Sequence, residues 1–279
     1  MQSKLLSIVI PSYNQGMYIR KTLESVLAQK ADDIEVLVID GGSTDNSVEV
    51  IKEYADRLDY WVSEPDRGQS HAFNKGFQRA SGHYLTWVNS DDLLLEGAID
   101  TFRDFLKGKQ MPDWVAANSM WVDVEGRIIS CTVNAGWSEY ARKSGALTVT
   151  GPSSFFSKSL LERVGWLRED YHYSMDTELW YRFASEGMRY ETMNHFVWAL
   201  RLHPEAKVSG GDFDKEHSSF QKRANEARRT KTLYYPDFST GLLHPLWIAF
   251  VRLKRLAKLR SLLLTASRKG RSASVNTLK

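Results

Sequence analysis

The feature that most constrains this chain is the alternation of short apolar runs with helix-like segments over its first 89 residues. The apolar runs, rich in β-branched and aromatic residues, span residues 5–10, 34–40, 58–64 and 83–89. The segments between them with apolar residues at helical spacing span residues 16–29, 43–55 and 68–80. Nearly continuous apolar strands that alternate with helices predict a parallel sheet covered by helices on both faces.

Polar or glycine-rich clusters follow each of the four expected strands. In chain order they read PSYNQG, DGGSTD, EPDRG and NSDD. Ligands of open parallel sheets bind beyond the carboxyl ends of the strands, where these clusters would meet. The sequence therefore predicts a binding site at this edge of the sheet.

The second half of the chain is less regular. Residues 114–131 predict two strands joined by a hairpin turn at Glu125–Gly126. Residues 157–167 and 174–187 predict helices, the second of which ends at Gly187.

Composition limits the classes of protein that fit. The net charge of +3 is small for a nucleic-acid-binding protein, and the single Cys131 excludes an internal disulfide framework and a cysteine-rich zinc site. The N-terminal apolar run ends at Pro11, too early for a signal peptide, and no apolar run is long enough for a transmembrane helix. We therefore expect a cytoplasmic protein that does not bind nucleic acid.

The adjacent acids Asp91 and Asp92 follow the apolar run at 83–89 directly. Two carboxylates near an apolar core are costly unless a positive group neutralises them. A divalent cation with oxygen ligands would do so, and Mg²⁺ typically takes one or two carboxylates plus substrate phosphates. The alternative is that the pair lies in a solvated loop and caps a helix that begins near Glu96.

Two further strand ends carry candidate ligand-binding groups. Asp40 ends the second strand before two glycines, where its carboxylate could accept hydrogen bonds from a base or a ribose; the same residues also form an ordinary turn. Arg67 precedes Gly68 after the third strand, where a guanidinium could bind a diphosphate or a base, or lie in a surface loop.

Five stretches together resemble one known family. They are SIVIPSYNQGMYIRKTLESVLAQ, VIDGGSTDNS, SEPDRGQSHAFNKGFQRASG, NSDD and MDTELWYRFASEG. In this order and spacing they are similar to the inverting, nucleotide-sugar-dependent glycosyltransferases of family two, which have the GT-A fold. The resemblance covers roughly residues 5 to 205. It implies a Rossmann-like α/β domain, a UDP-sugar or other nucleotide-sugar donor, a glycan or lipid-linked acceptor, and Mg²⁺ or Mn²⁺.

On the donor side, the resemblance implies roles for four residues. Pro11, Tyr13 and Asp40 would line the nucleoside pocket, with Asp40 facing the base. Arg67 would lie beside the base or the diphosphate.

The metal motif of the family matches NSDD. The resemblance places Asp92 on the metal and Asp91 on the ribose or metal, while Asn89 departs from the acidic pattern. His203 matches a histidine near the diphosphate or metal; its alternative is a packed or surface side chain.

Glycosyl transfer with inversion needs a base that takes the proton of the acceptor hydroxyl. The acidic motif that supplies it in the family matches MDTEL, so the resemblance implies Asp176 as the base, with Glu178 as the second candidate. Met175 stands where relatives often have an acid. The alternative is that both acids stabilise a helix N-terminus.

These observations predict a GT-A domain at residues 1–210, with a nucleotide-sugar-binding half (1–109) and an acceptor half (110–210). A basic, helical extension would follow at 211–279. No acidic residue follows Asp237, and the basic residues between 252 and 271 are Arg252, Lys254, Arg255, Lys258, Arg260, Arg268, Lys269 and Arg271. The segment 246–264 predicts a basic helix that lies on an anionic membrane surface at the inner face, or packs on the domain or a partner.

Two rival functions stay open at this point. One is a nucleotidyltransferase on a related fold, although PSYNQGMYIR lacks the dense glycine and basic residues that grip phosphates. The other is an inactive sugar- or lipid-binding homologue, with which Asn89 and Met175 are consistent.

Overall fold

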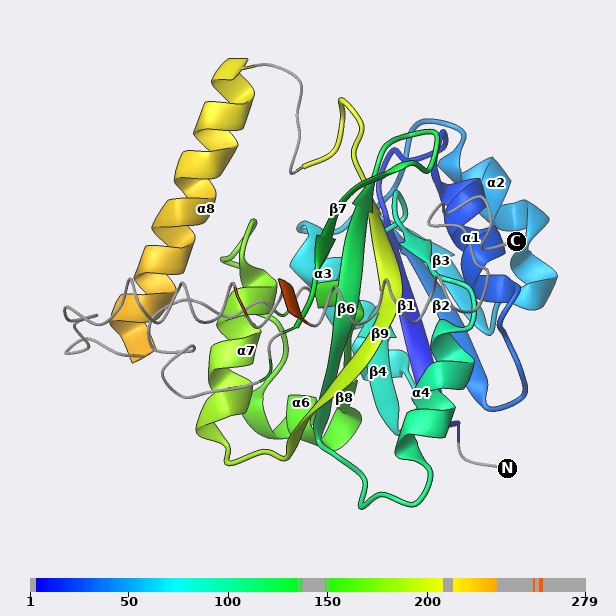
Figure 1. Ribbon diagram of the computed structural model, residues 1–279. Helices are drawn as coiled ribbons and strands as arrows, with labels where there is room; N and C mark the ends of the chain where they lie inside the picture. The colour runs from blue at the N-terminus through cyan, green and yellow to red at the C-terminus, as the bar shows by residue number, and fades with distance from the viewer. Residues whose placement is uncertain are drawn as a thin grey trace.

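The computed structural model describes residues 4–134, 136, 149, 151–207, 213–234, 253, 256 and 257. Within these residues nine strands form one twisted sheet with helices on both faces (Figure 1). The strands are β1 (Leu6–Ser12), β2 (Ile34–Asp40), β3 (Tyr60–Ser63), β4 (Tyr84–Trp87), β5 (Leu93–Leu94), β6 (Trp114–Val122), β7 (Ile128–Thr132), β8 (Ser154–Ser157) and β9 (Tyr190–Arg201). The α-helices are α1 (Ile19–Leu27), α2 (Ser47–Glu53), α3 (Gln69–Arg79), α4 (Ala98–Leu106), α6 (Lys158–Val164), α7 (Met175–Ser185) and α8 (Phe213–Tyr234).

The first half of the sheet confirms the predicted parallel arrangement. Its strands lie in the order β3-β2-β1-β4, and every neighbouring pair is parallel. Their carboxyl ends therefore lie at one edge, and the four polar clusters meet there. Rossmann-like order at this position is what the alternation of strands and helices predicted.

The second half of the sheet is mixed. Strand β8 pairs antiparallel with both β4 and β6, which joins the two halves of the chain in one sheet. Strand β9 runs parallel to β6, and β5 pairs with β9 antiparallel. The predicted hairpin is confirmed: β6 and β7 are antiparallel, and Gly126 at the turn has a φ of 86°, which glycine adopts without strain.

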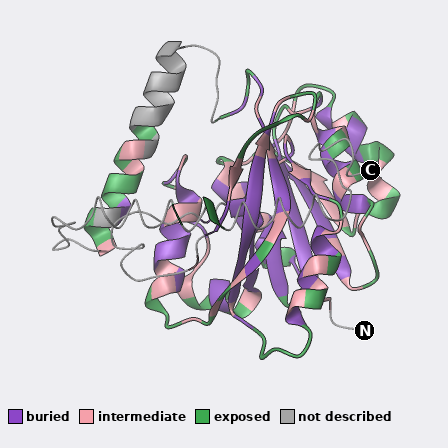
Figure 2. Ribbon diagram, in the orientation of Figure 1, coloured by how far each residue is buried: buried purple, intermediate pink, exposed green. Residues whose placement is uncertain are grey.

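Two apolar clusters, one on each face, hold the layers together. Leu6, Ile8 and Ile10 of β1 pack with α1, α2 and α4 on one face, whereas Val9 packs with α3, α6 and α7 on the other. This alternation follows from the two-residue period of a strand. Figure 2 shows the central strands buried along most of their length, whereas β3 is half-buried and β7 is largely exposed.

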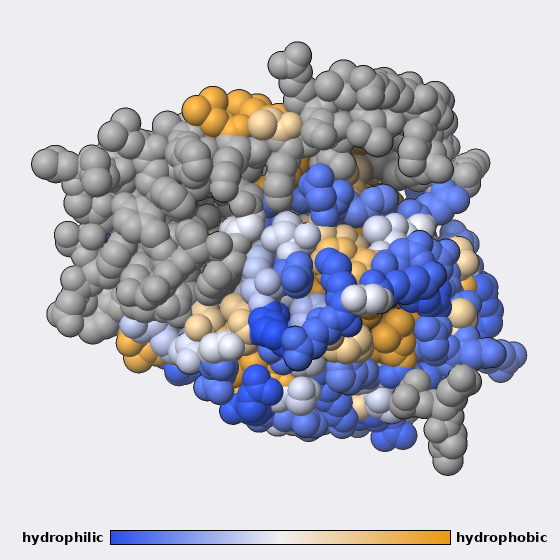
Figure 3. Space-filling model, turned by 60° about the horizontal axis from the view of Figure 1, so that its bottom comes forward, coloured by the Kyte–Doolittle hydropathy of each residue, from blue (hydrophilic) through white to orange (hydrophobic). Residues whose placement is uncertain are grey.

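The described part of the C-terminal extension is α8, which lies alongside α7 (Figure 1). Most of the segment 246–264, for which we predicted a basic helix, lies outside the described residues. Among the described helices, none has the length and apolar character needed to cross a membrane. Figure 3 shows one face of the molecule, on which hydrophilic side chains dominate and apolar ones are scattered.

Candidate active site

A cavity of about 800 Å³ opens at the carboxyl ends of the parallel strands, where the sequence placed the site. It is lined by Pro11 at the end of β1 and Tyr13 after it, by Gly41 and Gly42 after β2, and by Asp91 after β4. Side chains from β6, β9 and the start of α7 close the other side. A volume of this size suits a nucleotide-sized ligand.

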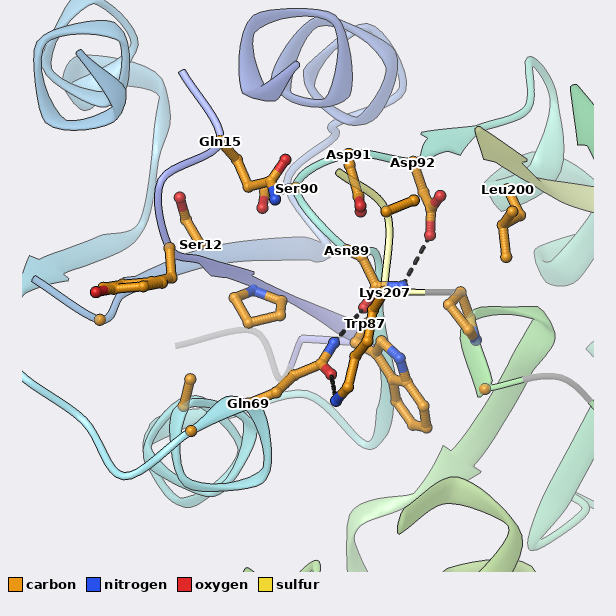
Figure 4. Close-up of a pocket in the computed structure, with 18 of the residues that line it drawn as sticks. Ser12, Gln15, Gln69, Trp87, Asn89, Ser90, Asp91, Asp92, Leu200 and Lys207 are labelled. Carbon is orange, nitrogen blue, oxygen red and sulfur yellow. Dashed lines mark hydrogen bonds between the residues drawn. The ribbon is translucent and has the colours of Figure 1, made fainter. Parts of the chain in front are cut away.

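The two adjacent acids have different environments, although both line the cavity (Figure 4). Asp92 is 2% exposed, and its carboxylate accepts hydrogen bonds from the Arg201 backbone N–H (3.0 Å) and the Asn89 amide (2.8 Å). The Asp91 side chain is 20% exposed, and its Oδ2 lies 3.2 Å from His203 Nε2. Of the two carboxylates, Asp91 is therefore the more accessible to a ligand in the cavity.

Burial decides the protonation of Asp92. Loss of solvation raises its pKa well above the ordinary value, and the neighbouring charge of Asp91 raises it further. The hydrogen bonds from Arg201 N–H and Asn89 act in the opposite direction but do not offset burial. A cation placed against this pair would be stabilised by both carboxylates.

The nearest protein cation is the Arg201 guanidinium, which is 4% exposed and lines the cavity. Desolvation lowers the pKa of Arg201, while Asp92 and Asp91 raise it. Its Nε and Nη2 have no hydrogen-bond partner among the described residues. Buried guanidinium donors are normally paired, so their orientation beside a cavity suits an anionic ligand such as a diphosphate.

His203 lies beneath Asp91, with its side chain 0% exposed. Its ring packs on the Tyr18 ring at a centroid distance of 4.0 Å, and its Nδ1 lies 3.6 Å from Glu205. The prediction placed His203 near the metal, and the structure brings it to the same acid.

The fit of these residues to a divalent cation depends on the ligands a substrate would add. Among the described residues no group of three or more His, Cys, Asp or Glu side chains is arranged to hold a metal by itself. Adjacent ligands of an octahedral ion bound at about 2.1 Å are separated by about 3 Å. The 3.2 Å between Asp91 Oδ2 and His203 Nε2 is close to that separation. Asp91 lines the cavity, whereas His203 is buried outside the lining, so a divalent cation in the cavity would need oxygen ligands from a substrate in addition to Asp91.

Asn89, the neutral residue in the expected acidic motif, has a bridging position. Its amide nitrogen donates to Asp92, and its carbonyl oxygen accepts a 3.0 Å hydrogen bond from Gln69 (Figure 4). Gln69 in turn accepts from Lys207. An acid at position 89 would place a third carboxylate beside Asp92, so the amide is the side chain that matches both neighbours.

Asp40, predicted to face the base, is not at the cavity surface. It is fully buried, and its carboxylate accepts hydrogen bonds from Gly42 N–H, Ser43 N–H and the Ser43 and Ser63 hydroxyls. Asp40 therefore shapes the loop whose glycines line the cavity. Asp66, which the prediction passed over, lines the cavity, and a Cβ at Gly41 would lie 2.5 Å from its Oδ2.

Arg67 also differs from its predicted position. It is exposed and forms a two-point ion pair with Glu169, at 2.8 Å and 3.0 Å. Its neighbours Asp66 and Gly68 line the cavity, whereas Arg67 is outside the lining. Glu169 is 102 residues away in the chain, so no local pattern could have indicated this pairing.

The two candidate bases, Asp176 and Glu178, differ in how far their side chains are buried. Asp176 lines the cavity at the first turn of α7, and its carboxylate accepts a 2.7 Å hydrogen bond from Thr177 N–H. Glu178 is outside the cavity lining and 0% exposed, and its carboxylate is paired with Arg182 at 2.8 Å and with the Tyr234 hydroxyl at 2.8 Å. A buried, paired carboxylate cannot meet an acceptor hydroxyl, so the geometry favours Asp176.

Arg201, Asp66 and Lys207 are cavity residues that the prediction did not select. The sequence RLH at 201–203 contained a signal for Arg201, because a basic residue two positions before His203 points to the same side of an extended strand. Asp66 and Lys207 become site residues only through the loops that carry them.

Comparison with known proteins agrees with this geometry. Residues 7–162, more than half of the chain, match the family described as Glycosyl transferase family 2. An uncharacterized glycosyltransferase of Rickettsia typhi is 26% identical over 205 residues, which cover 65% of this chain and 59% of that protein. The chain belongs to glycosyl transferase family 2, a class of enzymes that transfer sugars.

Solved structures confirm the fold. S. aureus TarS 1-349 in complex with UDP matches with a TM-score of 0.61 at 16% identity, covering 96% of this chain and 93% of that one. The mannosyltransferase PcManGT from Pyrobaculum calidifontis, in complex with GDP-Man and Mn²⁺, matches with a TM-score of 0.58 at 18% identity, covering 99% and 83%. The particular domain in this chain is thus a family 2 domain of GT-A fold, as predicted.

Proposed function

We propose that this protein transfers a sugar from a nucleotide diphosphate donor, a UDP-sugar, to a hydroxyl of a glycan or lipid-linked acceptor, with inversion at the anomeric carbon. The observation that carries the proposal is one cavity with three matched groups. Asp91 would provide a metal ligand, Arg201 would provide donors that have no hydrogen-bond partner among the described residues for a diphosphate, and Asp176 would provide a carboxylate for a proton.

The donor would lie along the carboxyl ends of the parallel strands. Pro11, Tyr13 and Asp66 would contact the nucleoside, with the loop shaped by Asp40 beneath it. The donors of Arg201 would bind the diphosphate. UDP and GDP-Man are bound by the two structural neighbours, which supports a nucleotide-sugar donor here.

Asp91 would hold the divalent cation, with the buried His203 and Asp92 side chains next to it. When bound, such an ion offsets the negative charge that develops on a leaving diphosphate. The Mn²⁺ in the complex of the Pyrobaculum calidifontis mannosyltransferase supports this choice of ion.

In the transfer itself, the acceptor oxygen forms a bond to the anomeric carbon as the bond from that carbon to the diphosphate oxygen breaks. Asp176 accepts the proton of the acceptor hydroxyl, and the nucleoside diphosphate leaves with the bonding electron pair. Attack opposite to the leaving group inverts the anomeric configuration. An accessible carboxylate is needed for this step, and Asp176 meets that requirement.

The membrane would be a second partner. The eight basic residues between 252 and 271 form a cationic segment that anionic lipid would attract, and a lipid-linked acceptor would be found at the same surface. We therefore propose peripheral attachment at the cytoplasmic face.

Thermal shift with a panel of UDP- and GDP-sugars, with and without Mn²⁺, tests the donor. A rise in melting temperature that needs both nucleotide sugar and Mn²⁺ is expected. Hydrolysis of the stabilising donor in the presence of Mn²⁺ then separates an enzyme from an inactive binding homologue. A chain that neither binds nor cleaves any nucleotide sugar contradicts the proposal.

A further inference from the structure

Helix α7 carries the proposed base, and its N-terminus lacks a cap of its own. Its N-cap residue is Ser174, whose side chain makes no capping hydrogen bond to the helix. The first backbone N–H groups of a helix need partners outside it, and an acidic side chain is the most favourable one.

Glu226 of α8 supplies that acidic group from 52 residues further along the chain. Its Oε1 accepts a 2.9 Å hydrogen bond from His172 N–H. Its Oε2 accepts from Tyr173 N–H and Ser174 N–H, each at 2.9 Å, and from the Ser174 hydroxyl at 3.0 Å. One carboxylate thus binds three consecutive backbone N–H groups immediately before α7.

The ionised form of Glu226 suits these contacts. Burial alone would raise its pKa, but the hydrogen bonds from His172, Tyr173 and Ser174 outweigh it, so the pKa is lowered. A carboxylate that accepts several backbone N–H bonds is stabilised as the anion.

Further contacts from α8 hold the same region. Arg229 pairs with Asp170 at 2.6 Å, and the Tyr234 hydroxyl donates to Glu178 at 2.8 Å. Helix α8 therefore binds the segment before α7 and the first turn of α7 itself.

The segment that Glu226 holds borders the cavity. Tyr173 lines the cavity, and Asp176 follows two residues after Ser174. A displacement of residues 172–174 would move both side chains, and misplacement of a reacting group by about 1 Å can cost about 100-fold in rate.

We propose that Glu226 is a positioning residue, which acts through residues 172–174 to hold Asp176 and Tyr173 at the acceptor side of the cavity. This role rests on the proposed glycosyltransferase function. It predicts that Glu226 affects the rate of transfer and leaves binding of the nucleotide unchanged, because Asp91, Arg201 and Asp66 lie on other elements.

The test compares Glu226→Gln with Arg228→Gln in the full chain. Arg228 is an exposed residue of the same helix, so its substitution controls for changes in α8 alone. Gln keeps the shape of Glu, but its NH₂ group replaces one acceptor oxygen and would face backbone N–H groups, which are also donors. Three quantities are measured: the affinity for UDP with Mn²⁺, the turnover number for Mn²⁺-dependent hydrolysis of a nucleotide sugar, and hydrogen exchange of the amides at 172–174. The nucleotide sugar is UDP-GlcNAc or GDP-mannose, whichever the wild type cleaves.

For Glu226→Gln we expect turnover to fall at least about tenfold, the Kd for UDP to stay within about twofold, and exchange at 172–174 to accelerate. Arg228→Gln should match the wild type in all three. Unchanged turnover in Glu226→Gln overturns the role, and so does a loss of UDP affinity in proportion to the loss of rate. A wild type that neither binds nor cleaves any nucleotide sugar contradicts the proposed function, whereas accelerated exchange with unchanged turnover contradicts only the positioning role.

Discussion

At the scale of single residues, neighbours in sequence have opposite roles in this structure. Asp91 faces the cavity and Asp92 is buried, and Asp176 lines the cavity while Glu178 is paired with Arg182. In both pairs, burial and hydrogen-bond partners decide which carboxylate meets a ligand. The roles therefore divide within each acidic motif.

The metal assignment is tested by Asp91→Asn. We expect the Mn²⁺-dependent part of the UDP affinity to disappear and turnover to fall at least about 100-fold, because a neutral amide neither holds the ion nor shares its charge. Isothermal titration with UDP, with and without Mn²⁺, measures the first effect. Asp92→Asn is the matched comparison: if it alone abolishes Mn²⁺-dependent binding while Asp91→Asn does not, Asp92 is the metal ligand.

The base assignment is tested by Asp176→Asn. Loss of a general base lowers turnover by about 10²- to 10⁴-fold, with the Kd for the donor unchanged because the base acts on the acceptor. Glu178→Gln serves as a contrast, since it breaks a buried ion pair and should lower the melting temperature instead. Should donor affinity fall in step with turnover in Asp176→Asn, this residue belongs to the donor site.

At the scale of elements, the close packing of α3 on β1 requires a glycine at position 76. Gly76 packs on β1, where a Cβ would lie 2.4 Å from Val9 Cγ1. The close approach lets α3 cover β1 and β2 with Ala72, Phe73 and Phe77. Gln69 at the start of this helix then reaches Asn89 at the end of β4.

Gly76→Ala tests this packing. Alanine favours a helix by about 1 kcal/mol over glycine, but overpacking a tight core costs about 1–3 kcal/mol. We expect net destabilisation, measured as a lower midpoint of urea unfolding with an unchanged slope. Gln78→Ala, on the exposed side of α3, should leave the midpoint nearly unchanged. A Gly76→Ala protein that is more stable than the wild type would show that β1 and α3 can separate without cost.

At the scale of the whole molecule, the two halves of the chain are one body around one sheet. Strand β8 joins β4 to β6, so the donor and acceptor sides of the cavity are held by continuous hydrogen bonding. Helix α8 packs on α7 and belongs to this body, although the sequence placed it in the extension that begins at residue 211. The basic residues from 252 onward follow it.

The basic segment gives a prediction for the whole chain. Each Lys or Arg near an anionic surface contributes about 1 kcal/mol, and salt screens this attraction beyond about 10 Å. We expect the full chain to sediment with vesicles that contain anionic lipid at low salt and to be released at high salt. A chain ending at Tyr235 keeps α8 and should stay in the supernatant with its hydrolytic activity intact. Equal sedimentation of both proteins would exclude this role for the basic segment.

Local pattern in the sequence determined the order of strands and helices, the parallel half of the sheet and the edge where the site lies. Periodicity and strand ends are properties of neighbouring residues, and they pointed to Asp91 at this edge, whereas Asp176 and His203 were proposed from the resemblance; Asp91 and Asp176 line the cavity. Tertiary structure alone decided the partners of each side chain. The Asp40 carboxylate accepts hydrogen bonds from its own loop and from the Ser63 hydroxyl, and Arg67 is paired with Glu169.

The same limit explains two sets of contacts that the sequence alone could not show. The unpaired donors of Arg201 and the contact of Glu226 with residues 172–174 depend on segments far apart in the chain. The sequence specifies which side chains can carry a charge, but the burial and the hydrogen-bond partners of each side chain are determined when distant segments pack. Because these two properties determine which carboxylate is accessible and which guanidinium lacks a partner, the chemistry of the site is decided by the tertiary fold.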